Sequence, residues 1–140
     1  MTAKGDAPMT AKVTPVNPET LATPRGYSHG MKGHGEILFV AGQIGWDRNG
    51  HMVSSDFVAQ FAQALDNVLE VVWKAGGEPA SVARLVVYVT DKAEYLRHVK
   101  AVGAAYRERM GKHFPAMALV EVKALLEDAA KVEIEATAIL

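Results

Sequence analysis

The sequence contains no cysteine. This absence excludes disulfide bonds, thiolate metal ligands and thiol nucleophiles, and it agrees with a protein of a reducing compartment. No apolar run approaches the roughly 20 residues that cross a bilayer, and the N-terminus lacks the apolar segment of a signal peptide. We therefore expect a cytoplasmic protein that has no membrane partner.

An excess of charge of either sign is missing as well. Lysine and arginine number 15 against 16 acidic residues, which gives a formal net charge of −1 and a pI of about 6.5. Proteins that bind nucleic acid usually carry a basic face, so we expect no nucleic-acid partner. The 140 residues are 49% hydrophobic and 22% charged, which is ordinary for one globular domain with a sizeable core.

The chain divides into a short tail and one domain. Residues 1–12 contain Met1-Thr-Ala-Lys and its repeat Met9-Thr-Ala-Lys, and we interpret them as an N-terminal tail to which we assign no function. Residues 13–140 form the single predicted domain. It opens with residues 13–26, whose prolines favour extended or looped backbone.

Strands are predicted from short apolar or alternating runs. Residues 27–32 lead into a Gly-His-Gly turn, and together with residues 36–44 they predict a hairpin. Later strands are predicted over residues 82–90, 114–122 and 131–139.

Two helices are predicted between these strands. Apolar residues at spacings of three and four predict a helix over residues 56–75, with Ser54 or Ser55 as its N-terminal cap. The sequence Asp91-Lys-Ala-Glu has the spacing of a capping box and opens a second helix, which ends at Gly111.

This order of elements indicates an α+β domain of two layers, a mixed sheet with both helices on one face. Both faces of the sheet are apolar, because Leu85 and Val87 alternate with Val86 and Tyr88 along one strand. Two helices cover only one face, and soluble monomers avoid a large exposed apolar patch. We therefore expect other copies of the chain to bury the second face, in an oligomer whose size the pattern does not give.

Glu133 lies on the polar face of the last strand. One interpretation is a general acid or base, or a carboxylate that holds water, at a subunit interface. The other is an acid at the rim of the sheet that stays solvated, and the residue pattern alone favours this second interpretation. Glu135 has the same two interpretations.

Metal and nucleotide sites are not indicated. The histidines have no metal-ligand spacing, and we expect no metal ion. Gly42 and Gly45 bracket Gln43 without the pattern of a phosphate-binding loop, which argues against a nucleotide.

Basic residues of the second helix, Arg97, Lys100 and Arg107, fall near one stripe. An RNA-contacting face is one interpretation, but no stacking aromatic residues accompany the charges, which favours a solvated helix face. Trp46 follows a strand in a loop and is a candidate for the wall of a pocket.

Several motifs occur in an order that is specific for a fold. They are Tyr27-Ser-His-Gly, Phe39-Val-Ala-Gly-Gln-Ile, Gln63-Ala-Leu-Asp-Asn-Val, Val87-Tyr-Val-Thr-Asp, Phe114-Pro-Ala, Val120-Glu-Val and Val132-Glu-Ile-Glu-Ala. Over about residues 25–139 the chain resembles the RidA/YjgF family, which is also labelled endoribonuclease L-PSP. The resemblance implies a chorismate-mutase-like α+β fold and a homotrimer that binds small molecules in clefts between subunits.

The resemblance also implies an activity. Family members with deaminase activity hydrolyse reactive imines and enamines to 2-oxo acids and ammonia without a cofactor. An arginine after Phe-Pro-Ala binds the substrate carboxylate, and a glutamate on the last strand positions the attacking water. The matching positions here are Met117 and Glu133. The candidate ligand-binding residues are Tyr27, Gln43, Trp46, Tyr106, Met117 and Leu119.

Met117 departs from the family pattern, because methionine has no donor for a carboxylate. We therefore expect either a hydrolase of altered substrate range or a protein that binds small molecules without catalysis. Arg25, two residues before Tyr27, is the nearest candidate to supply the missing guanidinium. RNA cleavage is the least favoured function, because the charge balance does not support it.

Overall fold

The computed structural model describes residues 13–140, and the predicted tail lies outside the described residues. The centre of the domain is a four-stranded sheet in the order β3 (Ile37–Gln43), β6 (Val132–Ile139), β4 (Val82–Val89) and β5 (Ala116–Glu121). The strands β3 and β4 run antiparallel to β6, whereas β5 runs parallel to β4. The sheet is therefore mixed, as predicted.

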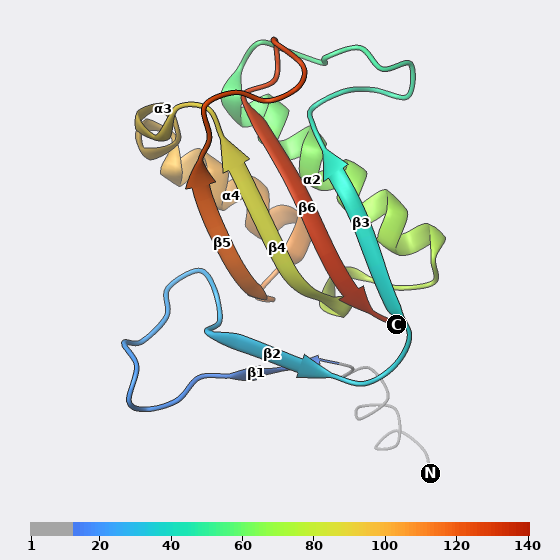
Figure 1. The fold of residues 1–140 in the computed structure, drawn as a ribbon, viewed down its shortest axis with the longest axis vertical. Helices are drawn as coiled ribbons and strands as arrows, with labels where there is room; N and C mark the ends of the chain where they lie inside the picture. The colour runs from blue at the N-terminus through green and yellow to red at the C-terminus, as the bar shows by residue number, and fades with distance from the viewer. Residues whose placement is uncertain (1–12) are drawn as a thin grey trace.

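Helices lie on one side of this sheet. Figure 1 shows α2 (Phe57–Lys74) and α4 (Val99–Met110) behind the strands, with α3 (Lys92–Arg97) leading into α4. The apolar stripe predicted for α2 is buried and packs on the helix-facing side chains of β4 and β6. The α+β prediction is confirmed. None of the helices of the described residues is long and apolar enough to cross a membrane.

The N-terminal cap of α2 was predicted wrongly. Asp56 is the cap, and its carboxylate accepts a hydrogen bond from the backbone N–H of Ala59 at 2.9 Å. The Ser54 hydroxyl oxygen instead accepts from the N–H of Asp56 at 2.9 Å. The serine therefore orients the capping residue rather than capping the helix itself.

The second predicted helix is broken at His98 into α3 and α4. In a continuous helix, the Glu94 carbonyl would accept from the backbone N–H of residue 98. Here the His98 ring nitrogen Nδ1 contacts that carbonyl at 2.9 Å, and the backbone N–H of His98 donates to the Tyr95 carbonyl instead. A side chain has replaced the backbone donor, which is a recognised cause of helix breaks.

The predicted hairpin before the sheet was also wrong. Strand β2 (Gly30–Gly33) pairs antiparallel with β1 (Val13–Val16), and β3 pairs with β6. The prolines favour extended or looped backbone over residues 13–26, and residues 13–16 are extended; Pro15 is tolerated because β1 lies at the edge of a two-stranded sheet. The pair of strands β1 and β2 lies below the ends of the main strands in Figure 1.

We call the face of the four-stranded sheet that is turned away from the helices the open face. Its large apolar side chains are exposed in the single chain, with Phe39 at 77% and Ile37 at 61% of their surface accessible. Tyr88 and Glu133 are cross-strand partners on its two central strands. The prediction of a second apolar face is confirmed by these exposures.

Gln60 connects α2 to the segment that leads into β6. Its side chain is fully buried, donates to the carbonyls of Ser54 and Ala129 at 2.9 and 3.0 Å, and accepts from the N–H of Lys131 at 2.8 Å. These bonds fix the start of β6 on α2, and therefore the position of Glu133 along the sheet.

We expect Gln60→Leu to lower the free energy of unfolding by at least about 3 kcal/mol, because three backbone groups lose their partner and each unsatisfied buried group costs about 1–3 kcal/mol. Urea unfolding at a fixed protein concentration measures this loss. Gln63→Leu is the control, since Gln63 is half-buried and donates only to the Asn67 side chain. Equal losses in the two variants would contradict the role assigned to Gln60.

Candidate functional site

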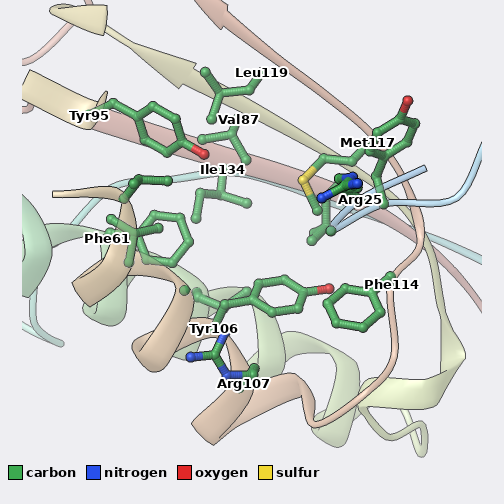
Figure 2. A pocket seen from close by; sticks show the side chains of 17 residues that line it. Arg25, Phe61, Val87, Tyr95, Tyr106, Arg107, Phe114, Met117, Leu119 and Ile134 are labelled. Atoms are coloured by element: carbon green, nitrogen blue, oxygen red, sulfur yellow. The ribbon is translucent and has the colours of Figure 1, made fainter. Parts of the chain in front are cut away.

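A cavity of about 470 Å³ lies between the sheet and the helices, and we call it the helix-side cavity. It exists because α4 packs on α2, so that the inner side chains of the edge strand β5 are only partly covered. Met117 and Leu119 of β5 line it together with Val87 and Ile134 of the neighbouring strands, while Tyr106 projects from α4 (Figure 2).

The structure brings together four of the predicted ligand-binding residues. Tyr27, Tyr106, Met117 and Leu119 all line the helix-side cavity. They come from the loop before β2, from α4 and from β5, so their meeting depends on the packing of three separate elements.

The segment that carries Tyr27 is held against the start of β5. The Ser28 N–H donates to the Pro115 carbonyl at 3.1 Å, and the Ser28 hydroxyl donates to the Phe114 carbonyl at 2.6 Å. Arg25 also lines the cavity, and Figure 2 shows its guanidinium at the same end as Met117. The chain turns between these residues at Gly26, whose φ of 77° is a conformation that favours glycine.

Tyr106 forms a fixed wall of the cavity. Its ring stacks on Phe114 with centroids 5.7 Å apart, and its hydroxyl donates to the His113 carbonyl at 2.6 Å. Burial raises the pKa of the Tyr106 phenol above its usual value. The phenol is therefore protonated at neutral pH, and its ring forms part of the cavity lining.

Glu133 does not line the helix-side cavity, because it lies on the open face. Its neighbour Ile134 points into the cavity, and successive residues of a strand point to opposite faces. Gly42 of β3 leaves space for the carboxylate, since a Cβ at residue 42 would overlap it.

The two carboxylates of β6 differ in their contacts. Glu135 accepts a hydrogen bond from the Tyr88 phenol at 2.6 Å, and this bond raises the pKa of Tyr88. No hydrogen bond or ion pair joins Glu133 to another side chain of residues 13–140. Both oxygens of Glu133 are therefore without a side-chain partner among the described residues, whereas one oxygen of Glu135 is engaged.

Gln43 and Trp46 lie away from the helix-side cavity. The Gln43 amide donates to the Ala41 carbonyl at 3.2 Å. The Trp46 carbonyl accepts from the Asn67 side chain at 2.9 Å, which fixes the loop between β3 and α2. The prediction that Trp46 forms a pocket wall does not hold for this cavity.

Comparison with known proteins identifies the family. The family model described as Endoribonuclease L-PSP matches residues 18–140. A 2-iminobutanoate/2-iminopropanoate deaminase of Escherichia coli is 35% identical over 108 residues, which are 75% of this chain and 80% of that protein. The chain belongs to the RidA/YjgF family.

Further relatives agree in sequence and in fold. A RutC family protein of Pyrococcus horikoshii is 34% identical over 113 residues, which are 80% of this chain and 85% of the relative. A crystal structure of a Rid family protein of Yersinia pestis has a TM-score of 0.81 and 35% identity, and covers 92% of this chain and 99% of its own. The YjgF gene product of Escherichia coli has a TM-score of 0.64 with 33% identity, over 90% of this chain and 98% of its own.

One residue that lines the cavity was not among the binding residues expected from the sequence of this RidA/YjgF chain. Arg107, like Arg97 and Lys100, is exposed as a solvated helix face requires, but it also lines the helix-side cavity while the other two do not. A signal was present in the sequence at Gly103, one turn earlier on α4. The Arg107 guanidinium lies over this glycine, where a Cβ would come within 3.2 Å of Nη1.

The described residues do not assemble a metal site. No group of three or more histidine and carboxylate side chains within residues 13–140 is placed to hold an ion. Among the residues that the structure describes, no acidic side chain lines the cavity. Its chemistry is therefore that of apolar walls, phenol groups and two guanidinium groups.

Proposed function

We propose that the chain forms a homotrimer and hydrolyses imine or enamine metabolites in clefts between its subunits. Water adds to the C=N carbon, and the C–N bond then breaks to give a 2-oxo acid and ammonia. Met117 occupies the position at which the family pattern has a carboxylate-binding arginine. In this proposal, that difference changes the range of substrates and not the type of reaction. The name of the Escherichia coli relative, an iminobutanoate and iminopropanoate deaminase, supports the reaction class.

The main support for the proposal is that the residues matching the family's site positions lie on two opposite faces of one sheet. Met117, Leu119 and Tyr27 line the helix-side cavity, whereas Glu133 lies on the open face. Within one chain, the backbone of the sheet separates them. A carboxylate from the open face of a neighbouring copy can meet a molecule at the mouth of the cavity, which favours a site shared between subunits.

Each group has a role that its chemistry allows. Glu133, with both oxygens available, accepts the proton of the attacking water and orients that water towards the imine carbon. Tyr27 and Leu119 confine the substrate beside the edge strand. The reaction requires no change of oxidation state, so the proposal includes no cofactor.

The test is release of ammonia and 2-oxo acid from freshly generated imines of several amino acids, measured against the uncatalysed rate. A rate above background that is proportional to protein concentration supports hydrolysis. Binding without turnover across the panel would instead favour a non-catalytic binder of small molecules, the alternative that the missing donor at Met117 supports. RNA cleavage is not proposed, since the cavity is mostly apolar and the net charge is −1.

We expect sedimentation to give three times the monomer mass of 15.1 kDa at micromolar concentration. Phe39→Glu should shift the protein towards monomer, because a charge would be buried among the apolar residues of the open face. Leu126→Glu is the control, since Leu126 is 93% exposed in a loop outside the sheet. A wild-type protein that stays monomeric would rule out a site shared between subunits.

A further inference from the structure

The helix-side cavity is larger than a small imine needs. Its volume of about 470 Å³ lies within the roughly 300–1,000 Å³ of pockets that enclose drug-sized ligands. The imine of alanine carries one methyl group as its side chain and would leave most of this space empty. Beyond Met117 and Leu119 the walls are Val87, Ile134 and Phe61, which are apolar. The interior therefore favours a ligand with a large apolar group.

The charges at the cavity have one sign. Arg25 and Arg107 both line it, and no aspartate or glutamate of residues 13–140 does. Neither guanidinium forms an ion pair with an acidic side chain of residues 13–140. Two cations beside an apolar interior select a molecule with an anionic end and an apolar body.

Arg25 lies at the solvent-facing side of the helix-side cavity, where it can contact the anionic end of a ligand. Its segment is fixed by the two hydrogen bonds of Ser28 to the carbonyls of Phe114 and Pro115, which lie three and two residues before Met117. Arg25 itself is exposed, so its guanidinium reaches solvent as well as the cavity. Arg107 is exposed too, but it lies on α4 over Gly103. The site where the family pattern has its arginine is therefore approached by a guanidinium from a different element.

We propose that the ligand is a 2-imino or 2-oxo acid with an aromatic or large branched side chain, whose carboxylate is bound by Arg25. This inference rests on the proposed function for the reaction and adds the substrate class. Met117 then has a positive role. Its flexible thioether packs against the apolar body of the ligand, and sulfur makes favourable contacts with aromatic rings. The position has changed from an anchor to part of the apolar wall.

The imines of phenylalanine or leucine fit this description. Their hydrolysis consumes one water and releases ammonia and the corresponding 2-oxo acid, with the side chain unchanged. The 2-oxo acid has the same carboxylate and the same side chain as the imine, and it is stable enough for binding measurements. It is therefore the probe for the cavity.

Calorimetric binding of phenylpyruvate and pyruvate to the assembled protein tests the ligand class. We expect phenylpyruvate to bind at least tenfold more tightly, since each methylene-sized apolar group in a pocket is worth about tenfold or more. We expect Leu119→Phe, which fills part of the cavity, to reduce this ratio. Equal affinities, or tighter binding of pyruvate, would overturn the inference, as would phenylacetone binding as well as phenylpyruvate.

The anchor is tested by single charge removals. Arg25→Gln should weaken phenylpyruvate at least tenfold, because a hydrogen bond to a charged group contributes at least about that factor. Arg97→Gln is the matched control, because it removes a positive charge from exposed α3 outside the cavity. Sedimentation and thermal melting verify that both variants are intact. Loss of binding in Arg107→Gln but not in Arg25→Gln would contradict the assignment of Arg25.

The two proposals fail in different ways. Binding of phenylpyruvate that depends on Arg25, without ammonia release from any imine, would refute hydrolysis and keep the ligand class. Rapid hydrolysis of the alanine imine, with no activity on the phenylalanine imine and no phenylpyruvate binding, would refute the ligand class and keep hydrolysis.

Discussion

Glu133→Gln should lower kcat/KM for imine hydrolysis at least about a hundredfold, because a positioned base contributes about 10²–10⁴-fold and an amide cannot accept the proton of water. The amide keeps the size of the side chain, so the space left by Gly42 stays filled and the proposed trimer should persist. Ammonia release from freshly generated imine, together with sedimentation, measures both effects.

Glu135→Gln is the matched control for this change. It is the same substitution two residues away on the same face of β6, but Glu135 is engaged by the Tyr88 phenol. An amide oxygen still accepts that hydrogen bond, so we expect a change of less than about tenfold, since even the complete loss of one neutral bond costs only about 0.5–1.5 kcal/mol. Equal losses in the two variants would show that activity depends on negative charge on β6 in general, and that Glu133 is not a specific base.

The second large effect concerns the residue at which the chain departs from its family. We expect Met117→Arg to raise kcat/KM for the alanine imine about tenfold or more, because one added hydrogen bond to a charged carboxylate is worth about 1.5–3 kcal/mol. The longer, charged side chain also occupies the helix-side cavity, so the phenylalanine imine should be hydrolysed more slowly. The ratio of the two rates should therefore change by more than about tenfold.

The gain should depend on Glu133. In a Glu133→Gln background, the new arginine would bind the small imine without turnover, so the four proteins form a double-mutant cycle with strong coupling. Met117→Leu is the control for altered packing, since it changes the shape of the side chain without adding a donor. An inert Met117→Arg protein with an intact trimer would favour the non-catalytic alternative.

Patterns that depend on neighbouring residues were predicted well. The apolar stripe of α2, from Phe57 to Val72, is buried as its spacing indicated. The alternation of β6 placed Glu133 on the face opposite Ile134, and the structure has the same arrangement. Periodicity carries this information because side-chain direction in a regular element follows from position along the chain.

Predictions failed where a local group competes with regular structure. The broken helix at His98 depends on a ring nitrogen that reaches the Glu94 carbonyl, and helix periodicity does not encode that contact. β1 contains Pro15, which lacks a backbone N–H, and it pairs with β2 in a separate two-stranded sheet. Which strand accepts such a partner is not visible in the local sequence pattern. Both outcomes are decided by competition between partners for the same backbone groups.

The amino-acid sequence alone gives this chain an α+β architecture, a second apolar face and a carboxylate on that face. Strand order and packing are needed to place Met117 and Glu133 on opposite sides of the sheet, since β4 lies between β5 and β6. They are also needed to bring Arg25 and Arg107 to one cavity. These residues are far apart in the sequence, and their proximity follows from which elements bury each other's apolar surface, a property that no local pattern contains.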